Sequence, residues 1–157
     1  LQALGVGPGD EVVSVSNTFI STISAIVAVG ATPVFADIGS DNNLDPQAFE
    51  SAISKRTRAV IPVHLSGRPC DMDQILAIAR KHGIFVVEDA AQAAGARWGQ
   101  KRVGSFGEVG CFSLHPLKNL HAFGDAGVVV TDDDALAEKI RCRRNIGLIS
   151  RNEAQYW

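Results

Sequence analysis

The sequence predicts an α/β fold in which a mostly parallel sheet is covered by helices on both sides. Short runs rich in β-branched residues, such as IFVVED at residues 84–89, are apolar at nearly every position, which is typical of strands buried on both faces. These runs alternate with longer segments that have helical patterns and recognisable ends. Alternation of this kind requires crossover connections, which place helices over the faces of a sheet.

The expected elements follow one another along the chain. In order they are strands at residues 11–15, 32–38, 58–65, 84–89, 109–114 and 127–131, and helices at residues 17–29, 45–54, 72–82 and 133–145. The strand segments are rich in Val and Ile, which favour extended backbone. The second helix should begin at Asp45, because Pro46 suits the first helical turn. The last helix has an amphipathic pattern that ends near Asn145.

Capping residues mark the ends of two further helices. Asp71 can accept a hydrogen bond from the first turn of the third helix, and Gly83 suits the left-handed position that closes it. Either Asn17 or Thr18 is expected to cap the first helix, and Gly30 to end it. Both helices therefore have a start and a stop signal in the sequence.

Size and composition indicate a single globular domain. The chain has 157 residues, of which 46% are hydrophobic and 20% are charged, and its formal net charge is −2. This balance argues against a nucleic-acid surface or a disordered charged arm. The apolar runs are interrupted well before the length of a membrane span, and no charged-then-apolar leader opens the chain. We therefore expect no nucleic-acid or membrane partner and a cytoplasmic location.

The cysteines and histidines favour neither disulfides nor a metal site. Cys70, Cys111 and Cys142 are odd in number, far apart and without a Cys-x-x-Cys pair. The four histidines, at positions 64, 82, 115 and 121, lack the spacing of metal ligands. The expectation is three free thiols, buried or partly buried, and no metal.

Both ends of the sequence resemble cuts through a longer protein. The chain opens with LQALGVGPGDEV, without Met and as if inside a helix, and it closes at Gln155-Tyr156-Trp157 without a capping element. We therefore expect residues 1–157 to be an internal fragment, and segments of the site to lie outside it.

Three polar residues lie where strands of a parallel sheet should end. Asp89 closes the run IFVVED, Ser113 comes at the end of the next strand, and Lys118 lies in the polar, glycine-bearing loop that follows. Ligands of open α/β sheets bind at this edge. Taken singly, each residue has a commoner structural explanation: a turn cap for Asp89, a backbone partner for Ser113 and a solvated charge for Lys118.

Taken together, the three residues match the requirements of one cofactor. Pyridoxal phosphate needs a carboxylate for its pyridine nitrogen, a hydroxyl for its phosphate and an amine for its aldehyde. A lysine forms a Schiff base with an aldehyde when burial or a neighbouring cation lowers its pKa. The combination of Asp89, Ser113 and Lys118 therefore predicts pyridoxal 5'-phosphate as the cofactor.

The motif order, EDAAQAAGA followed by FSLHPLKNL, resembles the DegT/DnrJ/EryC1/StrS family of sugar aminotransferases, which are fold type I pyridoxal-phosphate enzymes. The resemblance extends over the chain. GVGPGDEVVSVSNTFISTISAIVAVGATPVFADI is similar to the family's early strand-helix-strand block, IPVHLSGRPCDMDQI to its middle, and KNLHAFGDAGVVVTDD to the segment after the lysine. It implies that residues 1–157 form the single large cofactor-binding domain, without the small C-terminal domain.

The resemblance also implies a role for each of five residues. Lys118 matches the lysine that attaches covalently to the cofactor and later carries a proton between cofactor and substrate carbons. Asp89 matches the residue that keeps the ring nitrogen protonated, and Gln92 a position beside the ring and its phenolic oxygen. Ser113 matches a phosphate ligand. Phe19 matches the aromatic residue that stacks on the ring, for which the alternative is a core phenylalanine.

By the same resemblance, the expected reaction is transamination. An amino acid, usually glutamate in this family, donates its amino group to a keto-sugar attached to a nucleotide diphosphate, giving an amino sugar for a polysaccharide or glycoside. The full-length protein is expected to be a homodimer. Which keto-sugar is used, and whether C3 or C4 is aminated, stays open.

The sequence also departs from the family pattern. The family's upstream Ser-Gly-Thr-type loop, which binds phosphate through backbone amides, would lie before Leu1. Its Asn-containing segment, which reaches a neighbouring subunit's active site, would begin past Trp157. His121 stands where many relatives have Gly, and is expected either to narrow the loop after the lysine or to reshape the sugar pocket.

Three alternatives compete with transamination. A pyridoxamine-dependent sugar dehydratase would replace the lysine, commonly with His, so Lys118 argues against it. A regulatory or non-catalytic relative, or a truncated chain unable to complete the site, remains open. A Rossmann-type dehydrogenase would need Gly-x-Gly-x-x-Gly after the first strand, where the sequence has Ser14-Val15-Ser16-Asn17.

Overall fold

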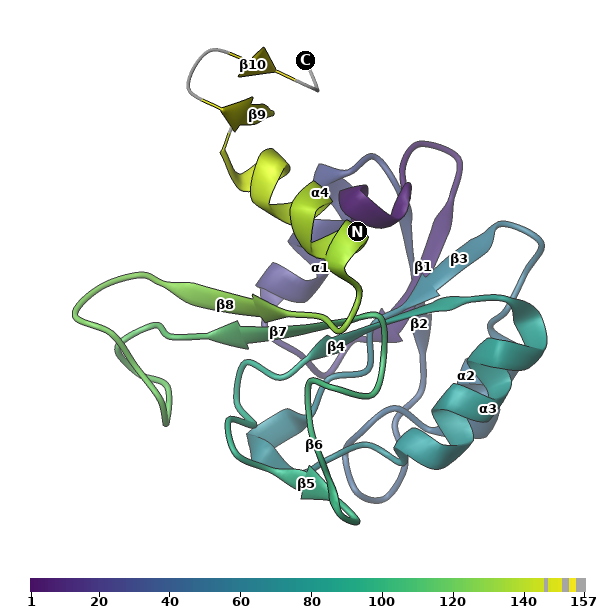
Figure 1. Ribbon diagram of the computed structural model, residues 1–157. Helices are drawn as coiled ribbons and strands as arrows, with labels where there is room; N and C mark the ends of the chain where they lie inside the picture. Colours follow the sequence, from purple (N-terminus) through teal and green to yellow (C-terminus); the bar gives the residue numbers. More distant parts are fainter. Residues whose placement is uncertain (146, 151–152, 155–157) are drawn as a thin grey trace.

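The computed structural model describes residues 1–145, 147–150 and 153–154 and confirms the α/β class (Figure 1). Its main sheet has six strands in the order β2-β1-β3-β4-β7-β8. These strands are β1 Glu11–Val15, β2 Thr32–Ala36, β3 Thr57–Val60, β4 Phe85–Asp89, β7 Val109–Ser113 and β8 Gly127–Val130. The first five are parallel, and β8 pairs antiparallel with β7 at one edge.

Helices cover both faces of this sheet. They are α1 Ile20–Ala28, α2 Pro46–Ser51, α3 Met72–His82 and α4 Asp134–Arg144, with short 3₁₀ turns at Gln2–Leu4 and Leu65–Gly67. Figure 1 shows α2 and α3 side by side on one face and α1 and α4 on the other. Two small antiparallel pairs complete the fold: β5 Arg97–Trp98 with β6 Lys101–Arg102, and β9 Leu148–Ser150 with β10 Glu153–Ala154.

Two apolar clusters fill the spaces between the sheet and its helices. Neighbouring residues of a strand point to opposite faces, so Val12 belongs to one cluster and Val13 to the other. Phe49 of α2 and Ile75 of α3 are fully buried on the side of Val13. Ile26 of α1 is fully buried on the side of Val12. Burial on both faces explains why the central strands are apolar at nearly every position.

Side-chain caps lie at the predicted starts of α2 and α3. The Asp71 carboxylate accepts from the Gln74 amide at 3.1 Å, and Gly83 has a φ of 65°, so α3 begins and ends where the sequence indicated. The Asp45 carboxylate likewise accepts from the Ala48 amide at 2.7 Å. However, α2 ends at Ser51, three residues earlier than expected.

The predicted start of α1 was wrong. Neither Asn17 nor Thr18 caps the helix, whose N-cap residue is Phe19 without a side-chain hydrogen bond. The Thr18 hydroxyl instead lies 2.7 Å from the Thr22 hydroxyl inside the helix. Its hydrogen-bonding capacity is therefore used within a polar chain and not on the orphan amides of the first turn.

β2 and β3 end well before their predicted bounds, β4, β7 and β8 are each one residue shorter than predicted, and the β5–β6 hairpin was not predicted. β2 ends at Ala36, and Ile38 forms only an isolated bridge with Leu44. β3 covers residues 57–60 and not 58–65, because the chain turns into the 3₁₀ segment Leu65–Gly67. The residues between β3 and this segment leave the sheet at the carboxyl ends of its strands.

The cysteines are free thiols, as predicted. Cys70 is buried, and burial raises the pKa of its thiol to about 12. Cys111 is partly buried, and burial also raises its pKa. In the described part of the chain no group of three potential ligands could hold a metal ion, and no helix is long and apolar enough to cross a bilayer.

Strand β8 forms an exposed apolar edge. Val128, Val129 and Val130 are 42%, 48% and 37% exposed, although they lie in a strand that pairs with β7. In the described residues, β8 is the last strand of the sheet on this side. Its outer edge and both of its faces are therefore largely uncovered.

Glycines allow the loop before β7 to lie directly on the sheet. A Cβ atom at Gly110 would lie 2.1 Å from the Gly104 carbonyl oxygen, and one at Gly107 would lie 2.3 Å from the Val86 carbonyl oxygen. Both distances are far below van der Waals contact, and both opposing atoms belong to the backbone. The loop at residues 103–107 can pack in this way only without side chains at these positions.

We predict that Gly110→Ala lowers the free energy of unfolding by about 3 kcal/mol, because the added methyl group displaces backbone. Gly7→Ala is the matched control, since its Cβ would lie 3.7 Å from the nearest atom, an ordinary contact. Denaturant unfolding of both variants measures the difference. Equal stability of the two variants would contradict the close packing of this loop.

Candidate active site

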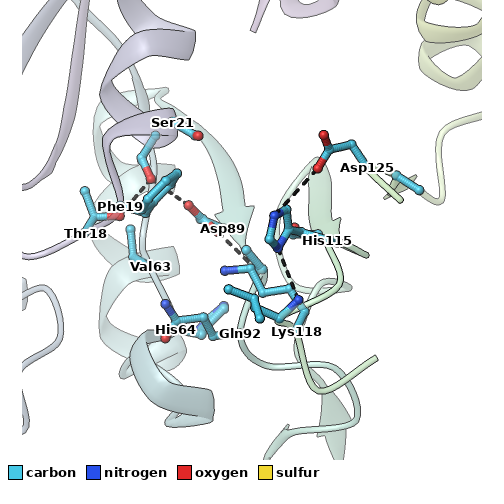
Figure 2. Close-up of a pocket in the computed structure, with 15 residues that line it drawn as sticks. Thr18, Phe19, Ser21, Val63, His64, Asp89, Gln92, His115, Lys118 and Asp125 are labelled. Atoms are coloured by element: carbon cyan, nitrogen blue, oxygen red, sulfur yellow. Dashed lines mark hydrogen bonds and ion pairs between the residues drawn. The ribbon is translucent and has the colours of Figure 1, made fainter. Parts of the chain in front are cut away.

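A cavity of about 490 Å³ opens at the carboxyl ends of β4 and β7 (Figure 2). The strand ends and the start of α1 bring together residues that are far apart in sequence. Its lining consists of Thr18, Phe19, Ser21, Thr22, Val63, His64, Asp89, Ala91, Gln92, Ser113, His115, Leu117, Lys118, Asp125 and Ala126. All five residues predicted from the sequence, Phe19, Asp89, Gln92, Ser113 and Lys118, are in this set.

Asp89 is held in one orientation by two donors. It is the last residue of β4, and its Oδ1 accepts from the Ala91 amide at 3.1 Å. Its Oδ2 accepts from the Thr22 hydroxyl at 2.7 Å. Because the proton of Thr22 is given to Asp89, the contact of 2.7 Å between Thr22 and Thr18 must have Thr18 as its donor. The Thr22 hydroxyl of α1, itself bonded to Thr18 just before the helix, therefore orients the carboxylate.

Gln92 has its amide direction set by the backbone of a neighbouring turn. Its Oε1 accepts from the Ser66 amide at 2.7 Å. The oxygen being engaged, the Nε2 group is the donor available to a ligand in the cavity. Ser66 has a φ of 53°, a left-handed conformation that is uncommon for a residue other than Gly or Asn. This left-handed conformation directs the Ser66 amide toward the Gln92 side chain.

Lys118 lies on a compact turn after β7. Its amide donates to the His115 carbonyl at 2.8 Å, and the loop is closed by the Leu114 amide, which donates to the Ala126 carbonyl at 2.8 Å. Among the residues that the structure describes, no hydrogen-bond or ion-pair partner contacts the Lys118 amine. Lys118 is a half-buried residue that lines the cavity.

His121 does not line the cavity. Its Nδ1 lies 3.2 Å from the Lys118 carbonyl oxygen, so the ring donates a hydrogen bond to the turn that carries the lysine. The side chain is exposed to solvent. His121 therefore braces the loop that carries the lysine, and it is not among the residues that line the cavity.

Ser113 and Phe19 border the cavity from opposite elements. The Ser113 hydroxyl oxygen accepts from the His115 amide at 3.3 Å, which leaves its proton free to be donated. The Phe19 side chain is 66% exposed at the start of α1, so it is not a core phenylalanine. Figure 2 shows its ring beside Asp89, facing the space in front of the carboxylate.

His115 is a cavity residue that was not predicted. Its Nδ1 accepts from the Leu117 amide at 3.2 Å, so the proton of the neutral ring lies on Nε2. Nε2 lies 3.8 Å from an Asp125 carboxylate oxygen across the mouth of the loop. Both side chains are exposed, which limits the strength of this pair.

Sequence reasoning also missed Thr22, His64 and Ser66. The Thr18–Thr22 spacing of one helical turn was a usable signal, because residues four apart share a helix face. His64 and Ser66 had no comparable signal, since their contacts with residues 88 and 92 span more than twenty positions. The parallel pairing of β3 and β4 brings His64 to the cavity and the Ser66 amide to Gln92.

The donor set suits pyridoxal phosphate. An amine, a carboxylate, an amide donor, a hydroxyl and an aromatic face converge on a cavity of about 490 Å³, a volume typical of small-ligand sites. The small side chains of Ala91 and Ala126 leave room for a flat ring between the strand ends. The fold and the site together define an α/β ligand-binding domain with a lysine in a cavity at the carboxyl edge of its sheet.

The chain belongs to the DegT/DnrJ/EryC1/StrS aminotransferase family, whose model matches residues 1–157. It is 53% identical over 148 residues to the UDP-N-acetyl-3-dehydro-alpha-D-glucosamine 3-aminotransferase of Acidithiobacillus ferrooxidans, covering 94% of this chain and 40% of that protein. It is 51% identical over 148 residues to the dTDP-3-amino-3,4,6-trideoxy-alpha-D-glucose transaminase of Streptomyces venezuelae, covering 94% and 39%. The chain thus spans about two fifths of the length of these relatives.

Solved structures agree with this assignment. The X-ray structure of S. venezuelae DesV has a TM-score of 0.96 and 49% identity, and the match covers 99% of this chain and 42% of that one. The Bacillus subtilis NtdA structure with bound cofactor PMP has a TM-score of 0.93 and 34% identity, covering 100% of this chain and 36% of that one. The predicted family and fold are therefore confirmed.

We predict that His121→Ala increases amide hydrogen exchange at residues 118–122 about fivefold, because one hydrogen bond of about 1 kcal/mol is lost. Arg102→Ala, at an exposed position outside this loop and outside the cavity, is the control and should leave exchange at residues 118–122 unchanged. Mass-spectrometric exchange measures both. An effect of the same size in the control would show that His121 has no special bracing role.

Proposed function

We propose that the full-length protein is a pyridoxal-phosphate-dependent aminotransferase and that residues 1–157 are its large, cofactor-binding domain. The observation that supports this proposal best is the convergence of Asp89, Gln92 and Lys118 on one cavity, with Thr22 and Ser66 fixing the first two. If Lys118 were only a solvated charge and Asp89 only a turn cap, there would be no reason for other side chains and amides to hold the cavity residues in fixed orientations.

The chain's residues divide the work in this proposal. Bound pyridoxal phosphate supplies an aldehyde for covalent attachment and a ring that accepts electrons. Lys118 holds the cofactor through Nζ and, when released, takes a proton from one carbon and returns it to another. Asp89 holds a proton on the ring nitrogen by a charge-assisted hydrogen bond. Gln92 donates from Nε2 to the phenolic oxygen.

Two further residues bind without taking part in proton transfer. The Ser113 hydroxyl donates its free proton to the phosphate. Phe19 covers one face of the ring, where stacking excludes water from the reacting atoms. Since the phosphate has more acceptor oxygens than Ser113 can satisfy, we infer that residues outside this chain complete its binding.

We infer that the donor is an amino acid, with glutamate as the expected donor, and that the acceptor is a nucleotide-linked keto-sugar. Two relatives above 50% identity are named for 3-amino sugars on UDP and dTDP, which supports a 3-keto-sugar as the substrate class. The product would serve polysaccharide or glycoside synthesis. Free thiols and a nucleotide-sugar substrate support a cytoplasmic location.

A second copy of the protein would complete the cavity. The loop at residues 117–123, which carries Lys118, exposes three large apolar side chains, with Leu117 88%, Leu120 57% and Phe123 fully exposed. Apolar side chains concentrated beside a site are typical of an interface. We therefore propose a homodimer in which this loop is covered by the neighbouring subunit.

A regulatory role is the second candidate. A relative from Geobacillus stearothermophilus, 51% identical over 145 residues, is named pleiotropic regulatory protein. A regulator could keep the cofactor cavity and sense its ligand without turnover. Steady-state release of 2-oxoglutarate from glutamate in the presence of keto-sugar would distinguish an enzyme from such a protein.

We predict that borohydride reduction of the cofactor-loaded full-length protein labels Lys118, because among the residues that the structure describes it is the lysine that lines the cavity with Asp89. Peptide mapping by mass spectrometry locates the label. Lys118→Ala should bind cofactor without labelling and lose transamination by several orders of magnitude. Lys101→Ala, at an exposed site outside the cavity, is the control. A label on another lysine would sink the assignment.

We predict that Thr22→Val lowers kcat about tenfold, because Asp89 loses a hydrogen bond of about 1.5 kcal/mol and with it a fixed orientation. Thr22→Ser keeps the hydroxyl and should retain most of the rate. Steady-state kinetics of the full-length variants measures both. Equal rates for Val and Ser at position 22 would show that the hydroxyl does not orient Asp89.

A further inference from the structure

A buried acid–histidine pair lies at the wall of the cavity, which His64 helps to line. The side chains of Glu88 and His64 are both 0% exposed, and His64 Nε2 lies 3.1 Å from Glu88 Oε2. The proposed chemistry uses neither residue. A buried carboxylate is costly unless other groups replace its hydration, so the pair needs an explanation.

The hydrogen bonds fix which ring nitrogen carries the proton. The Cys70 amide donates to His64 Nδ1 at 3.0 Å, so Nδ1 is an acceptor. The proton of the neutral ring must then lie on Nε2, which points to Glu88. The pair is therefore a neutral imidazole donating to a carboxylate.

Glu88 is held as an anion by four donors. Its Oε1 accepts from the amides of Phe106 at 2.6 Å and Gly107 at 2.9 Å. Its Oε2 accepts from the Gly104 amide at 2.7 Å and from His64. Burial opposes ionisation, but the bonds from His64, Gly107 and Gly104 outweigh it, so the pKa of Glu88 lies below its ordinary value. All of its acceptor sites face fixed donors.

The pair is coupled to both cavity residues that need orientation. Glu88 directly precedes Asp89 in β4, so its anchored side chain fixes the strand on the face opposite the Asp89 carboxylate. The His64 amide also donates to the Asp89 carbonyl at 3.0 Å. His64 further precedes the turn Leu65–Gly67, whose central amide, that of Ser66, holds Gln92.

We propose that His64 and Glu88 are a positioning pair that holds Asp89 and Gln92 against the cofactor ring. The inference rests on the proposed function, because that proposal assigns Asp89 to the ring nitrogen and Gln92 to the phenolic oxygen. The side chain of His64 acts through Glu88, which anchors β4, and through the turn that it begins. Both side chains are fully buried, so the pair acts on the cofactor through Asp89 and Gln92.

Two substitutions separate this role from packing. In His64→Gln the amide nitrogen can reach the position of Nε2 and still donate to Glu88. In His64→Asn the amide lies near the position of Nδ1, so the contact with Cys70 can be kept while Glu88 loses its donor. Both variants lose the ring, and a packing role alone would affect them similarly.

The readout is the pH midpoint of the visible absorbance change of the bound cofactor. A proton on the ring nitrogen carries a positive charge, which disfavours a second proton on the nitrogen that links the lysine to the cofactor. If Asp89 is misplaced and the ring nitrogen holds its proton less firmly, this repulsion weakens. The pH midpoint of the absorbance change should therefore rise. We expect His64→Asn to raise it by about one pH unit, at unchanged cofactor content. His64→Gln should stay close to the unmodified protein. Unmoved midpoints in both folded variants would overturn the inference.

A second measurement does not depend on the variants folding. Nitrogen NMR of the unmodified protein with labelled histidine should show His64 in the Nε2–H tautomer at neutral pH, and the Nδ1–H tautomer would overturn the inference. Reduction labelling separates the two proposals. No label on Lys118 overturns the proposed function and this inference with it, whereas a labelled Lys118 with unmoved midpoints overturns the inference alone.

Discussion

The carboxylate of Glu88 lies inside the protein, where an anion is stable only if fixed donors take the place of water. Three of its donors are backbone amides of residues 104–107, so the loop before β7 must lie directly against β4. Glycines at 107 and 110 make that approach sterically possible. The position of this loop in turn sets where β7 begins, and β7 delivers Ser113 and the lysine turn to the cavity. The buried charge of Glu88 thus constrains the loop before β7, then β7 itself, and through β7 the cavity.

Much of the fold could be predicted from local signals, and the errors have local causes. Helix α3 was predicted residue by residue because Asp71 and Gly83 mark its ends. The start of α1 was misassigned because Thr18 serves Thr22 and Asp89, a long-range demand that propensity does not contain. The β5–β6 hairpin has only two residues per strand and a polar sequence, so neither periodicity nor apolar content indicated it.

The site was predicted through its motifs and not through its geometry. Asp89, Ser113 and Lys118 were recognisable because each lies at the end of a strand or in the loop after it, and all three line the cavity. Most of the contacts that orient them had no signal in the sequence, for a physical reason. Thr22, His64 and Ser66 act through contacts between elements, and a hydrogen bond such as that from Ser66 to Gln92 exists only after parallel strands have aligned their ends. His121 could be named from the sequence, but its bond to the Lys118 carbonyl required the folded turn.

The uncovered edge of β8 also has a practical meaning. An edge strand is a template for another strand, and folded proteins usually protect such edges with charges, proline or a covering segment. Residues 127–130 read Gly-Val-Val-Val and contain none of these protective residues. Production of residues 1–157 alone therefore favours edge-to-edge aggregation. The solubility of the isolated domain depends on whatever covers these valines, independently of how well its cavity is formed.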